Sequence, residues 1–404
     1  MIGQGSWAGG GASSGAGGEG ALLALIAAGR ARSRAELADL SGLSRATVAQ
    51  RLSVLLGSGL VDEADETMRS GGRPARLLRL NTTFALTLAA DIGEERTHVA
   101  LTTLDGTVLD GLTEAVDIRR GPVPALEFLL ASFDALLARA GRSRRDVLGV
   151  GLSLPAPVDY ARGRVVGPSV MTGWDDFDIR GWFADRFEAP LFAENDVNLL
   201  MLADYRRARR DARHLFYVKI GTGIGSGIVA DGRIYRGAQG AAGDIGHIQF
   251  MRQPAPLCRC GKIGCVEARA AGWAIARDLR AEGIPAETAR DVVALVRAGE
   301  PHAINLVRQS GRILGEVLAN VVSILNPSRI VIGGTLAGVE EYLLSGVREM
   351  IYSRSLPLAT RELEIAVSPP DPDAGIVGAA LLVVEEATSP LNADDVVARY
   401  ARAS

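Results

Sequence analysis

The sequence predicts an α/β protein of two similar lobes, preceded by a small domain of helices and one hairpin. Three observations predict this architecture. Capped helical segments fill residues 21–60, and Val/Ile/Leu-rich strands alternate with helices from about residue 85. One strand–turn–strand pattern then occurs twice, at residues 86–109 and 215–235. Each copy contains an Ile-Gly turn and an Asp-Gly hairpin turn, so we expect two related lobes that face each other across a cleft.

The first 80 residues divide into a polar arm and a compact helical segment. Residues 1–20 are mostly Gly, Ala and Ser and bury too little apolar surface to offset the entropy of ordering, which predicts a disordered arm. Residues 21–80 are expected to form three helices and then a hairpin with strands at 60–65 and 75–81. N-cap serines, a capping box and terminal glycines set the helix boundaries, and these residues are Ser33, Ser44, Glu36, Gly29, Gly42 and Gly57.

The second and third of these helices are typical of a helix-turn-helix, and the hairpin adds a basic wing. The N-terminal end of the second helix of such a motif meets base edges, which requires short polar and basic side chains there. Residues 30–60 contain only two acidic residues, Glu36 and Asp39, against five arginines. The alternative is a packing module whose arginines are only solvated. We predict DNA contacts, including wing contacts with phosphates or a minor groove, by Ser44, Arg45, Thr47, Gln50, Arg51, Arg69, Arg73 and Arg76.

The overall composition is that of a globular protein without a net preference for nucleic acid. Hydrophobic residues make up 48% and charged residues 23%, with 44 basic against 47 acidic residues. A globally basic nucleic-acid binder is therefore excluded, whereas a local basic face is not. No apolar run reaches the roughly 18 residues of a membrane span, and no secretory signal pattern begins the chain. These features predict a cytoplasmic protein.

All three cysteines lie in the segment CRCGKIGC, at Cys258, Cys260 and Cys265. Three thiolates at this spacing can converge on one ion, and tetrahedral zinc needs one further ligand. His247 is the nearest histidine, which predicts a structural Cys3His site with one zinc per chain. The alternative is that the cysteines are buried small hydrophobes and His247 an ordinary core histidine. Their clustering favours zinc.

The motifs GTGIGSGIV, GDIGH and CRCGKIGCVE, in this order, resemble the ROK family of repressors, open reading frames and sugar kinases. Residues 21–80 in turn resemble the winged helix-turn-helix of bacterial regulators. The resemblance implies an actin-like, two-lobed domain over residues 81–404, with lobe 1 at about 81–195 plus the C-terminal helix and lobe 2 at about 196–374. It also implies that the cleft binds a sugar and that the chain forms a homodimer or homotetramer.

The family's sugar-binding motifs match four positions of this chain and differ at a fifth. The resemblance implies that Asn195, Asp196, His247 and Glu267 bond sugar hydroxyls, and Asp244 stands where the family usually has Glu. The shorter carboxylate at Asp244 changes the reach at that position and therefore the sugar preference. Carboxylate and amide groups suit adjacent hydroxyls, and zinc would fix the ring of His247. Asp196 has an alternative role as the cap of the helix that follows.

In a ROK kinase two glycine-rich turns hold the ATP phosphates, and only the second is intact here. That turn is GTGIGSG, and because a strand follows it rather than a helix, it is not a dinucleotide-binding fingerprint. The first turn, where the kinases carry Asp-x-Gly-Gly-Thr, reads Asp91, Ile92, Gly93, Glu94, Glu95. Two carboxylates there would repel a triphosphate. We therefore predict a protein without kinase activity, in which Asp196 is the vestigial base.

Two functions from different classes remain: a sugar-responsive transcription regulator, and an ATP-dependent sugar kinase with an added DNA-binding domain. The winged helix favours the first, and the retained Asp196 permits the second. A DNA-binding protein whose α/β part only dimerises would leave Asn195, Asp196 and Glu267 without a purpose. We predict a regulator, a repressor of carbohydrate uptake or catabolism genes. It would bind an inverted-repeat operator as a symmetric oligomer and be released by a monosaccharide or sugar derivative.

Overall fold

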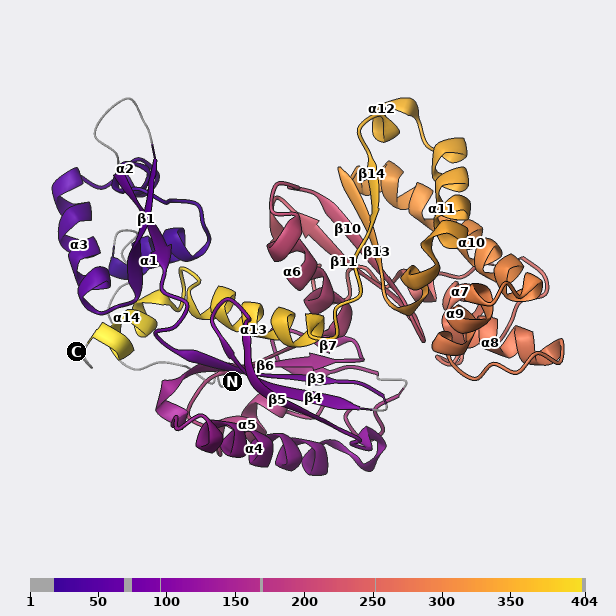
Figure 1. Ribbon diagram of the computed structural model, residues 1–404, viewed down its shortest axis with the longest axis horizontal. Coiled ribbons are helices and arrows are strands. Elements are labelled where there is room, and N and C mark those ends of the chain that lie inside the picture. Colours follow the sequence, from indigo (N-terminus) through magenta and orange to yellow (C-terminus); the bar gives the residue numbers. More distant parts are fainter. Residues whose placement is uncertain (1–17, 69–74, 95, 168–169, 251, 402–404) are drawn as a thin grey trace.

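The computed structural model contains a small N-terminal domain and two lobes (Figure 1). It describes residues 18–68, 75–94, 96–167, 170–250 and 252–401. Most of the predicted arm, the wing tip with Arg69 and Arg73, and Glu95 lie outside the described residues. None of the described helices is both long and apolar enough to span a membrane. The predicted fold class, an α/β protein of two lobes behind a small helical domain, is confirmed.

The N-terminal domain consists of three helices and a two-stranded antiparallel sheet. These are α1 (Glu19–Ala27), α2 (Arg34–Ser41), α3 (Arg45–Gly57), β1 (Val61–Met68) and β2 (Ala75–Leu80). Ser33 caps α2 by accepting the backbone N–H of Glu36, and Ser44 caps α3 by accepting that of Thr47. Side-chain caps satisfy N–H groups that have no partner inside a helix, so the sequence places the start of both helices.

One local prediction for this domain differs from the structure. The carboxylate of Glu36 accepts the backbone N–H of Arg32 at 2.6 Å rather than that of Ser33, so the capping box is only half formed. Helix α3 ends at Gly57, where the sequence predicts a stop. The chain then turns at Gly59, whose φ of +72° is a left-handed conformation that favours glycine.

Each lobe contains a five-stranded mixed sheet, and both sheets have the same topology. The order is β5-β4-β3-β6-β9 in lobe 1 and β12-β11-β10-β13-β14 in lobe 2. In each sheet three consecutive strands pair in antiparallel fashion and two later strands add in parallel. The strands are β3 (Leu86–Ile92), β4 (Thr97–Thr103), β5 (Val108–Glu114), β6 (Val147–Leu154) and β9 (Leu191–Asn195) in lobe 1, and β10 (Leu215–Ile220), β11 (Ile224–Ala230), β12 (Arg233–Ile234), β13 (Arg329–Gly333) and β14 (Glu364–Val367) in lobe 2. The repeated sequence pattern therefore corresponds to a repeated sheet.

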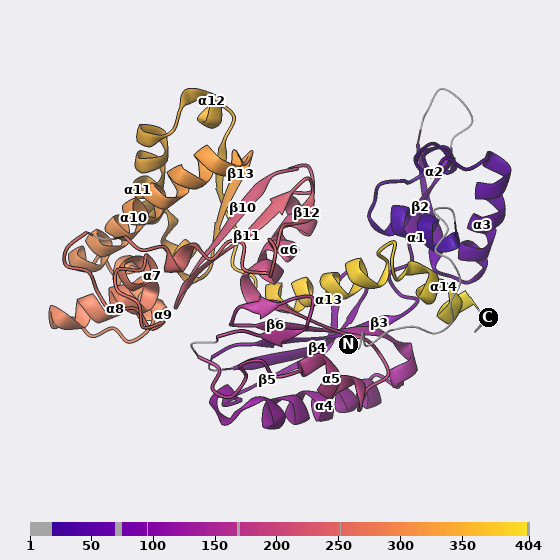
Figure 2. The ribbon, with the colours of Figure 1, turned by 180° about the vertical axis from the view of Figure 1, so that it is seen from behind.

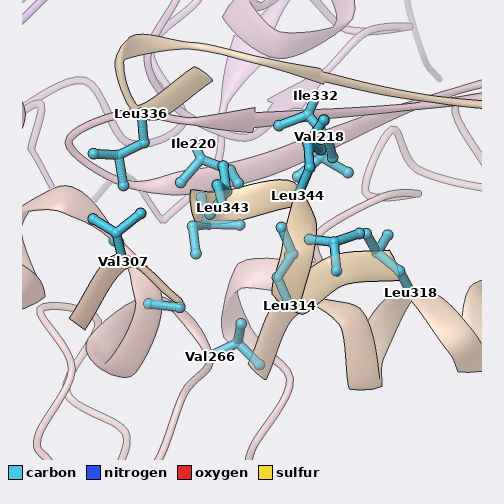
Figure 3. Packing of buried hydrophobic residues seen from close by; sticks show 14 of the residues in the cluster. Val218, Ile220, Val266, Val307, Leu314, Leu318, Ile332, Leu336, Leu343 and Leu344 are labelled. Carbon is cyan, nitrogen blue, oxygen red and sulfur yellow. The ribbon is translucent and has the colours of Figure 1, made fainter. Parts of the chain in front are cut away.

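Helices cover the outer face of each sheet and complete its core. In lobe 1, α4 (Pro122–Arg139) buries Phe133 against the sheet. In lobe 2, α10 (Pro301–Leu325) and α11 (Glu340–Arg354) pack Leu314 and Leu343 beneath the strand residues (Figure 3). The smaller elements are β7 (Val158–Asp159), β8 (Arg164–Val165), α5 (Ile179–Ala184), α7 (Glu267–Ala270), α8 (Gly272–Ala281), α9 (Ala289–Arg297) and α12 (Pro357–Thr360).

Two helices cross between the lobes in opposite senses. Helix α6 (Asp196–Ala208) follows the last strand of lobe 1, but its Met201 packs with Val229 in the sheet of lobe 2. Helix α13 (Ala374–Ala387) follows the last strand of lobe 2, but its Ile376 packs on the sheet of lobe 1. Both views show α13 lying along the sheet of lobe 1 and α6 lying beside lobe 2 (Figures 1 and 2). Each lobe is therefore covered by a helix that comes from the other.

The N-terminal domain shares a hydrophobic core with the end of the chain. Helix α14 (Ala393–Ala401) packs beside α1, and Asp394 accepts the backbone N–H of Gly20 at 3.0 Å. Leu52 of α3 and Val383 near the end of α13 belong to the same buried cluster. A shared core of this kind resists independent movement, so the N-terminal domain is held against lobe 1 and the end of α13.

Candidate functional site

One cysteine-rich loop of lobe 2 brings together the ligand atoms expected for a metal. The ligand atoms of His247, Cys258, Cys260 and Cys265 all lie within 4.8 Å of one another. The sulfur atoms of Cys260 and Cys265 are 3.7 Å apart, and Nδ1 of His247 lies 3.8 Å from the sulfur of Cys258. Tetrahedral zinc with bonds of about 2.3 Å separates its sulfur ligands by about 3.8 Å. The donor set and its spacing therefore fit a zinc ion.

The thiols of this loop differ in their acidity. Burial raises the pKa of Cys258 to about 12, and burial also raises the pKa of Cys265. Burial acts in the same direction at Cys260, but hydrogen bonds from Lys262 and from the neighbouring thiols lower its pKa overall. A bound metal requires thiolates, so loading this site must displace protons from Cys258 and Cys265.

Glu267, the first residue of α7, connects the cysteine loop to the second glycine turn. One carboxylate oxygen accepts the backbone N–H of Ile224 at 3.1 Å, directly after the turn. The other lies 3.4 Å from the indole nitrogen of Trp273 and 3.9 Å from the sulfur of Cys258. A Cβ added at Gly223 would lie only 2.6 Å from the carboxylate. Glycine is therefore needed at position 223 for this close approach.

Asp196 begins α6 and forms an ion pair with Lys219, near the end of β10. The Nζ atom of Lys219 lies 2.5 Å from Oδ2 of Asp196. Burial acts to lower the pKa of Lys219, but the charge of Asp196 and the hydrogen bond to it outweigh burial, and the pKa is raised. Lys219 is therefore an ammonium ion at neutral pH, and it is the counter-ion of the carboxylate that the sequence predicts to be a vestigial base.

Asp91 lies near the end of β3 and completes a cluster with this ion pair. Ser153 donates a hydrogen bond to its Oδ1 at 2.5 Å. Burial raises the pKa of Asp91, and the charge of Asp196 adds to that, although the hydrogen bond from Ser153 and the charge of Lys219 act in the opposite direction. We call Asp91, Ser153, Asp196 and Lys219 the interlobe charge cluster, because β3 and β6 belong to lobe 1 and β10 to lobe 2.

The structure gives Asn195 the helix-capping role that the sequence offers as an alternative for Asp196. Oδ1 of Asn195 accepts the backbone N–H of Val197 at 3.1 Å, and its Nδ2 donates to the carbonyl of Ala156 at 3.1 Å. The carboxylate of Asp196 is thereby released from capping and points to Lys219 instead. Any sugar hydroxyl at Asn195 must share atoms that already hold the protein together.

Sequence reasoning missed three charged residues of this region, Glu194, Lys219 and Arg236. Glu194 is buried, accepts hydrogen bonds from the backbone of Asn195 and from the side chain of Asn198, and pairs with Arg236 at 2.6 Å. A signal was present for two of them. Lys219 interrupts the apolar strand LFYVKIG, and Glu194 interrupts the end of PLFAEND. A charged residue in a buried strand requires a partner.

The first turn and Asp244 are more exposed than the rest of the candidate sugar site. The turn closes through the backbone N–H of Gly93, which donates to the carbonyl of Arg96 at 2.9 Å. Glu94 is exposed, as is Asp244 before the short helical turn at Ile245–His247. Glu95 lies outside the described residues. The structure thus brings Asp196, His247 and Glu267 into contact networks and leaves Asp244 facing solvent.

The candidate DNA-reading residues lie at the start of α3 and on the hairpin. Arg45 and Gln50 are exposed, whereas Arg51 is partly buried. The hydroxyl of Ser44 is used as the helix cap and lies 2.9 Å from that of Thr47. The predicted wing residue Arg76 is exposed and lies 3.6 Å from Glu63 of β1, which also pairs with Arg34. Acidic residues of β1, which the sequence argument left out, therefore offset part of the positive charge.

A family model described as "ROK family" matches residues 87–386. The xylose repressor of Bacillus spizizenii is 26% identical over 354 residues, which cover 87% of this chain and 91% of that protein. The glucokinase of Halalkalibacterium halodurans is 28% identical over 318 residues, which cover 75% of this chain and 96% of that protein. The glucokinase and the repressor are therefore nearly equally identical to this chain, but the match to the repressor extends over more of it.

One solved structure shares most of this arrangement. The crystal structure of a ROK family transcriptional regulator, described as a homologue of the E. coli MLC protein, superimposes with a TM-score of 0.80 at 26% identity. It covers 94% of this chain and 98% of its own length. The likeness therefore includes the N-terminal helical domain as well as both lobes.

Proposed function

The chain belongs to the ROK family, and we propose that it is a transcription regulator whose affinity for operator DNA is set by a sugar bound between the lobes. Residues 21–80 would be the DNA-binding domain and residues 81–404 the ROK domain, divided as the sequence predicts. One observation carries the proposal: the helical domain with the exposed Arg45 and Gln50 shares a core with α13, the helix that crosses between the lobes.

The proposed sugar site contains Asp196, His247 and Glu267, with Asn195 and Asp244 beside them. Oδ2 of Asp196 is bonded to Lys219, so Oδ1 is the oxygen placed to accept a hydroxyl. Glu267 binds the second glycine turn with one oxygen and has the other next to the cysteine loop. Fixed carboxylates of this kind suit the adjacent hydroxyls of a monosaccharide.

A zinc ion held by His247, Cys258, Cys260 and Cys265 would be structural. All four ligands come from the protein, so no coordination position is left for a substrate. When bound, the ion would fix the ring of His247 and the adjoining loop. Glu267, which lies against the sulfur of Cys258, would thereby be oriented toward the sugar.

Helices α6 and α13 provide a physical route from the sugar to the DNA-binding domain. Asp196 is the first residue of α6, and just beyond its last turn Arg210 approaches the DNA-binding domain. A Cβ added at Gly29, between α1 and α2, would lie 3.8 Å from the guanidinium of Arg210. A sugar that prefers one lobe arrangement would move α6 and α13 together and so bias the position of α3.

The operator is proposed to be an inverted repeat bound by a homodimer or homotetramer in the cytoplasm. One chain offers one recognition helix, so a two-fold symmetric site requires a second copy. Ser44, Arg45, Thr47, Gln50 and Arg51 would face the bases, while Arg69, Arg73 and Arg76 would reach phosphates. Relatives named as sugar repressors favour a repressor of carbohydrate genes that is released by its sugar.

The second candidate function is an ATP-dependent sugar kinase, which the glucokinase relative and the retained Asp196 favour. Two observations argue against it. The first glycine turn carries Glu94 where a triphosphate needs backbone N–H groups and small residues. Lys219 also occupies Oδ2 of Asp196, so only one oxygen of this carboxylate is left to accept a sugar proton.

Two measurements on the purified full-length chain test the regulator. Thermal unfolding is followed with D-xylose, D-glucose and N-acetyl-D-glucosamine, since a true ligand raises the midpoint by mass action. Binding of the DNA upstream of its own gene is then measured with and without the stabilising sugar. We expect a sugar-dependent loss of affinity of at least about tenfold. Operator binding that no sugar alters, or equal binding to random DNA, would overturn the proposal.

A further inference from the structure

Asp91 and Lys219 occupy equivalent positions in the two copies of the repeat. Each is the residue before last of the first strand of its sheet, in Asp91-Ile92-Gly93 of β3 and Lys219-Ile220-Gly221 of β10. The two sheets have the same topology, so the fold places both side chains at the same point of their lobes. One is an acid and the other a base.

Each of these residues also faces the start of the helix that arrives from the other lobe. A Cβ at Gly375, the second residue of α13, would collide with the carboxylate of Asp91. Lys219 binds Asp196, the first residue of α6. The start of a helix favours negative charge, and the acidic residue at the start of α13 is Asp91. At α6 the negative charge is Asp196 itself, and Lys219 is its counter-ion.

The ion pair leaves Asp196 one oxygen for a ligand. Oδ2 accepts the hydrogen bond from Lys219, and among the described residues no hydrogen bond reaches Oδ1. The ammonium holds Oδ2, which fixes the orientation of the carboxylate and leaves Oδ1 as the acceptor for a ligand hydroxyl. Asp91 and Asp196 repel each other, and Lys219 attracts both.

We propose that Lys219 is a positioning residue of the effector site, which holds Asp196 as a fixed hydrogen-bond acceptor for a sugar hydroxyl. This rests on the proposed function. The kind of ligand follows from the chemistry: a neutral polyol with a hydroxyl at Asp196, because the carboxylate is already matched by one cation.

The first test measures sugar binding by calorimetry with D-xylose, D-glucose and N-acetyl-D-glucosamine. For the sugar that binds the wild-type chain, Lys219→Met should lower the affinity by about tenfold or more, because Asp196 loses its orientation and its counter-charge. Lys219→Arg should bind within about threefold of wild type, because it restores the charge. With Lys219→Ala, added ethylammonium should recover affinity, whereas ethanol of similar size should not. A role in packing alone would respond equally to both additives.

The second test needs no sugar and examines the ion pair itself. Lys219→Met and Asp196→Asn should each lower the thermal midpoint by about 3 °C or more, and the double variant should lower it no further than the larger single effect. Additive shifts would overturn the proposal, as would unchanged sugar affinity in Lys219→Met. A wild-type chain that binds no sugar would instead overturn the proposed function, and this proposal with it.

Discussion

The two lobes share one sheet topology but differ at the turn where each begins. In lobe 2 the carbonyls of Gly221 and Thr222 accept backbone N–H groups from Gly272 and Trp273, and Glu267 binds the residue after the turn. In lobe 1 the backbone bond from Gly93 to Arg96 closes the turn on itself, and the described residues of the turn make no comparable backbone bonds to a neighbouring helix. The same sheet therefore occurs twice, but only the turn of lobe 2 is held by neighbouring elements among the described residues. The elements packed beside a turn, rather than the sheet itself, determine how firmly that turn is fixed.

The difference places the candidate metal site on the lobe with the fixed turn. The cysteine loop, Glu267 and the start of α8 all lie after β11 in the chain and pack against the second turn. Lobe 1 has nothing comparable among its described residues, and instead carries Asp91 with a raised pKa. Changes in lobe 2 should therefore damage ligand binding far more than changes at the turn of lobe 1.

Loss of the metal site should give the largest effect. Cys265→Ser, or a strong chelator, is expected to remove one zinc per chain and lower the thermal midpoint by about 10 °C, because structural zinc contributes directly to folding. Elemental analysis and calorimetry measure both quantities. Hydrogen exchange should increase around residues 247–267 and the second turn but not in the sheet of lobe 1. A chain without stoichiometric zinc when freshly purified would contradict the metal assignment.

The same site should show a definite pH dependence. The raised pKa values of Cys258 and Cys265 mean that zinc binding releases their protons. Zinc affinity should therefore fall as the pH is lowered, with zinc lost on titration from about pH 7.5 to 5 and regained on return. Affinity that is unchanged over this range would indicate ligands other than thiols.

Removal of the proposed sugar contacts should separate sugar response from DNA binding. Asp196→Ala and Glu267→Ala are expected to weaken sugar binding about a hundredfold, since each removes hydrogen bonds to a charged group, while operator affinity without sugar stays within about threefold. Asp185→Ala, an exposed carboxylate of lobe 1, is the matched control. If Asp185→Ala abolishes the response equally, the effect is one of general charge rather than of the site.

At the proposed DNA-binding domain the effects should be smaller and should depend on the DNA sequence. Arg45→Ala and Gln50→Ala are each expected to cost about 1–3 kcal/mol on the preferred operator and little on random DNA. Arg76→Ala should weaken all sequences alike and flatten the salt dependence, because it would contact phosphates. Its ion pair with Glu63 makes Glu63→Gln a useful companion, which should strengthen binding slightly. Loss of affinity without change of preference at Arg45 would place α3 outside the groove.

Local chemistry made much of the fold predictable from the sequence. Ser33 and Ser44 cap helices because their hydroxyls act on neighbours three residues away, and Cys258, Cys260 and Cys265 converge because a short loop confines them. The ion pair of Lys219 with Asp196 joins residues 23 positions apart on two elements. This pairing depends on helix α6 crossing to lobe 2, and the hydrophobic periodicity of the sequence does not encode that crossing.

The turn of lobe 1 supports the last and smallest prediction. The sequence predicts a protein without kinase activity because of Glu94 and Glu95 alone, but Glu94 is exposed, and solvent screens an exposed charge strongly. Lys219 then becomes a second obstacle, because it occupies one carboxylate oxygen of Asp196 whatever the turn contains. Replacing Glu94 and Glu95 together by glycine should therefore improve ATP binding by only about threefold. It should leave phosphorylation of the bound sugar far below the roughly 1 per second of an ordinary kinase.

A coupled assay with ATP, magnesium and the sugar found by thermal shift measures the phosphorylation rate in three proteins. These are the wild-type chain, the double-glycine variant and the double-glycine variant combined with Lys219→Met. Turnover near one per second in the wild-type chain would refute the regulator and restore Asp196 as a catalytic base. If only the double-glycine variant reached this rate, the two glutamates, and not Lys219, would be what prevents phosphorylation in the wild-type chain.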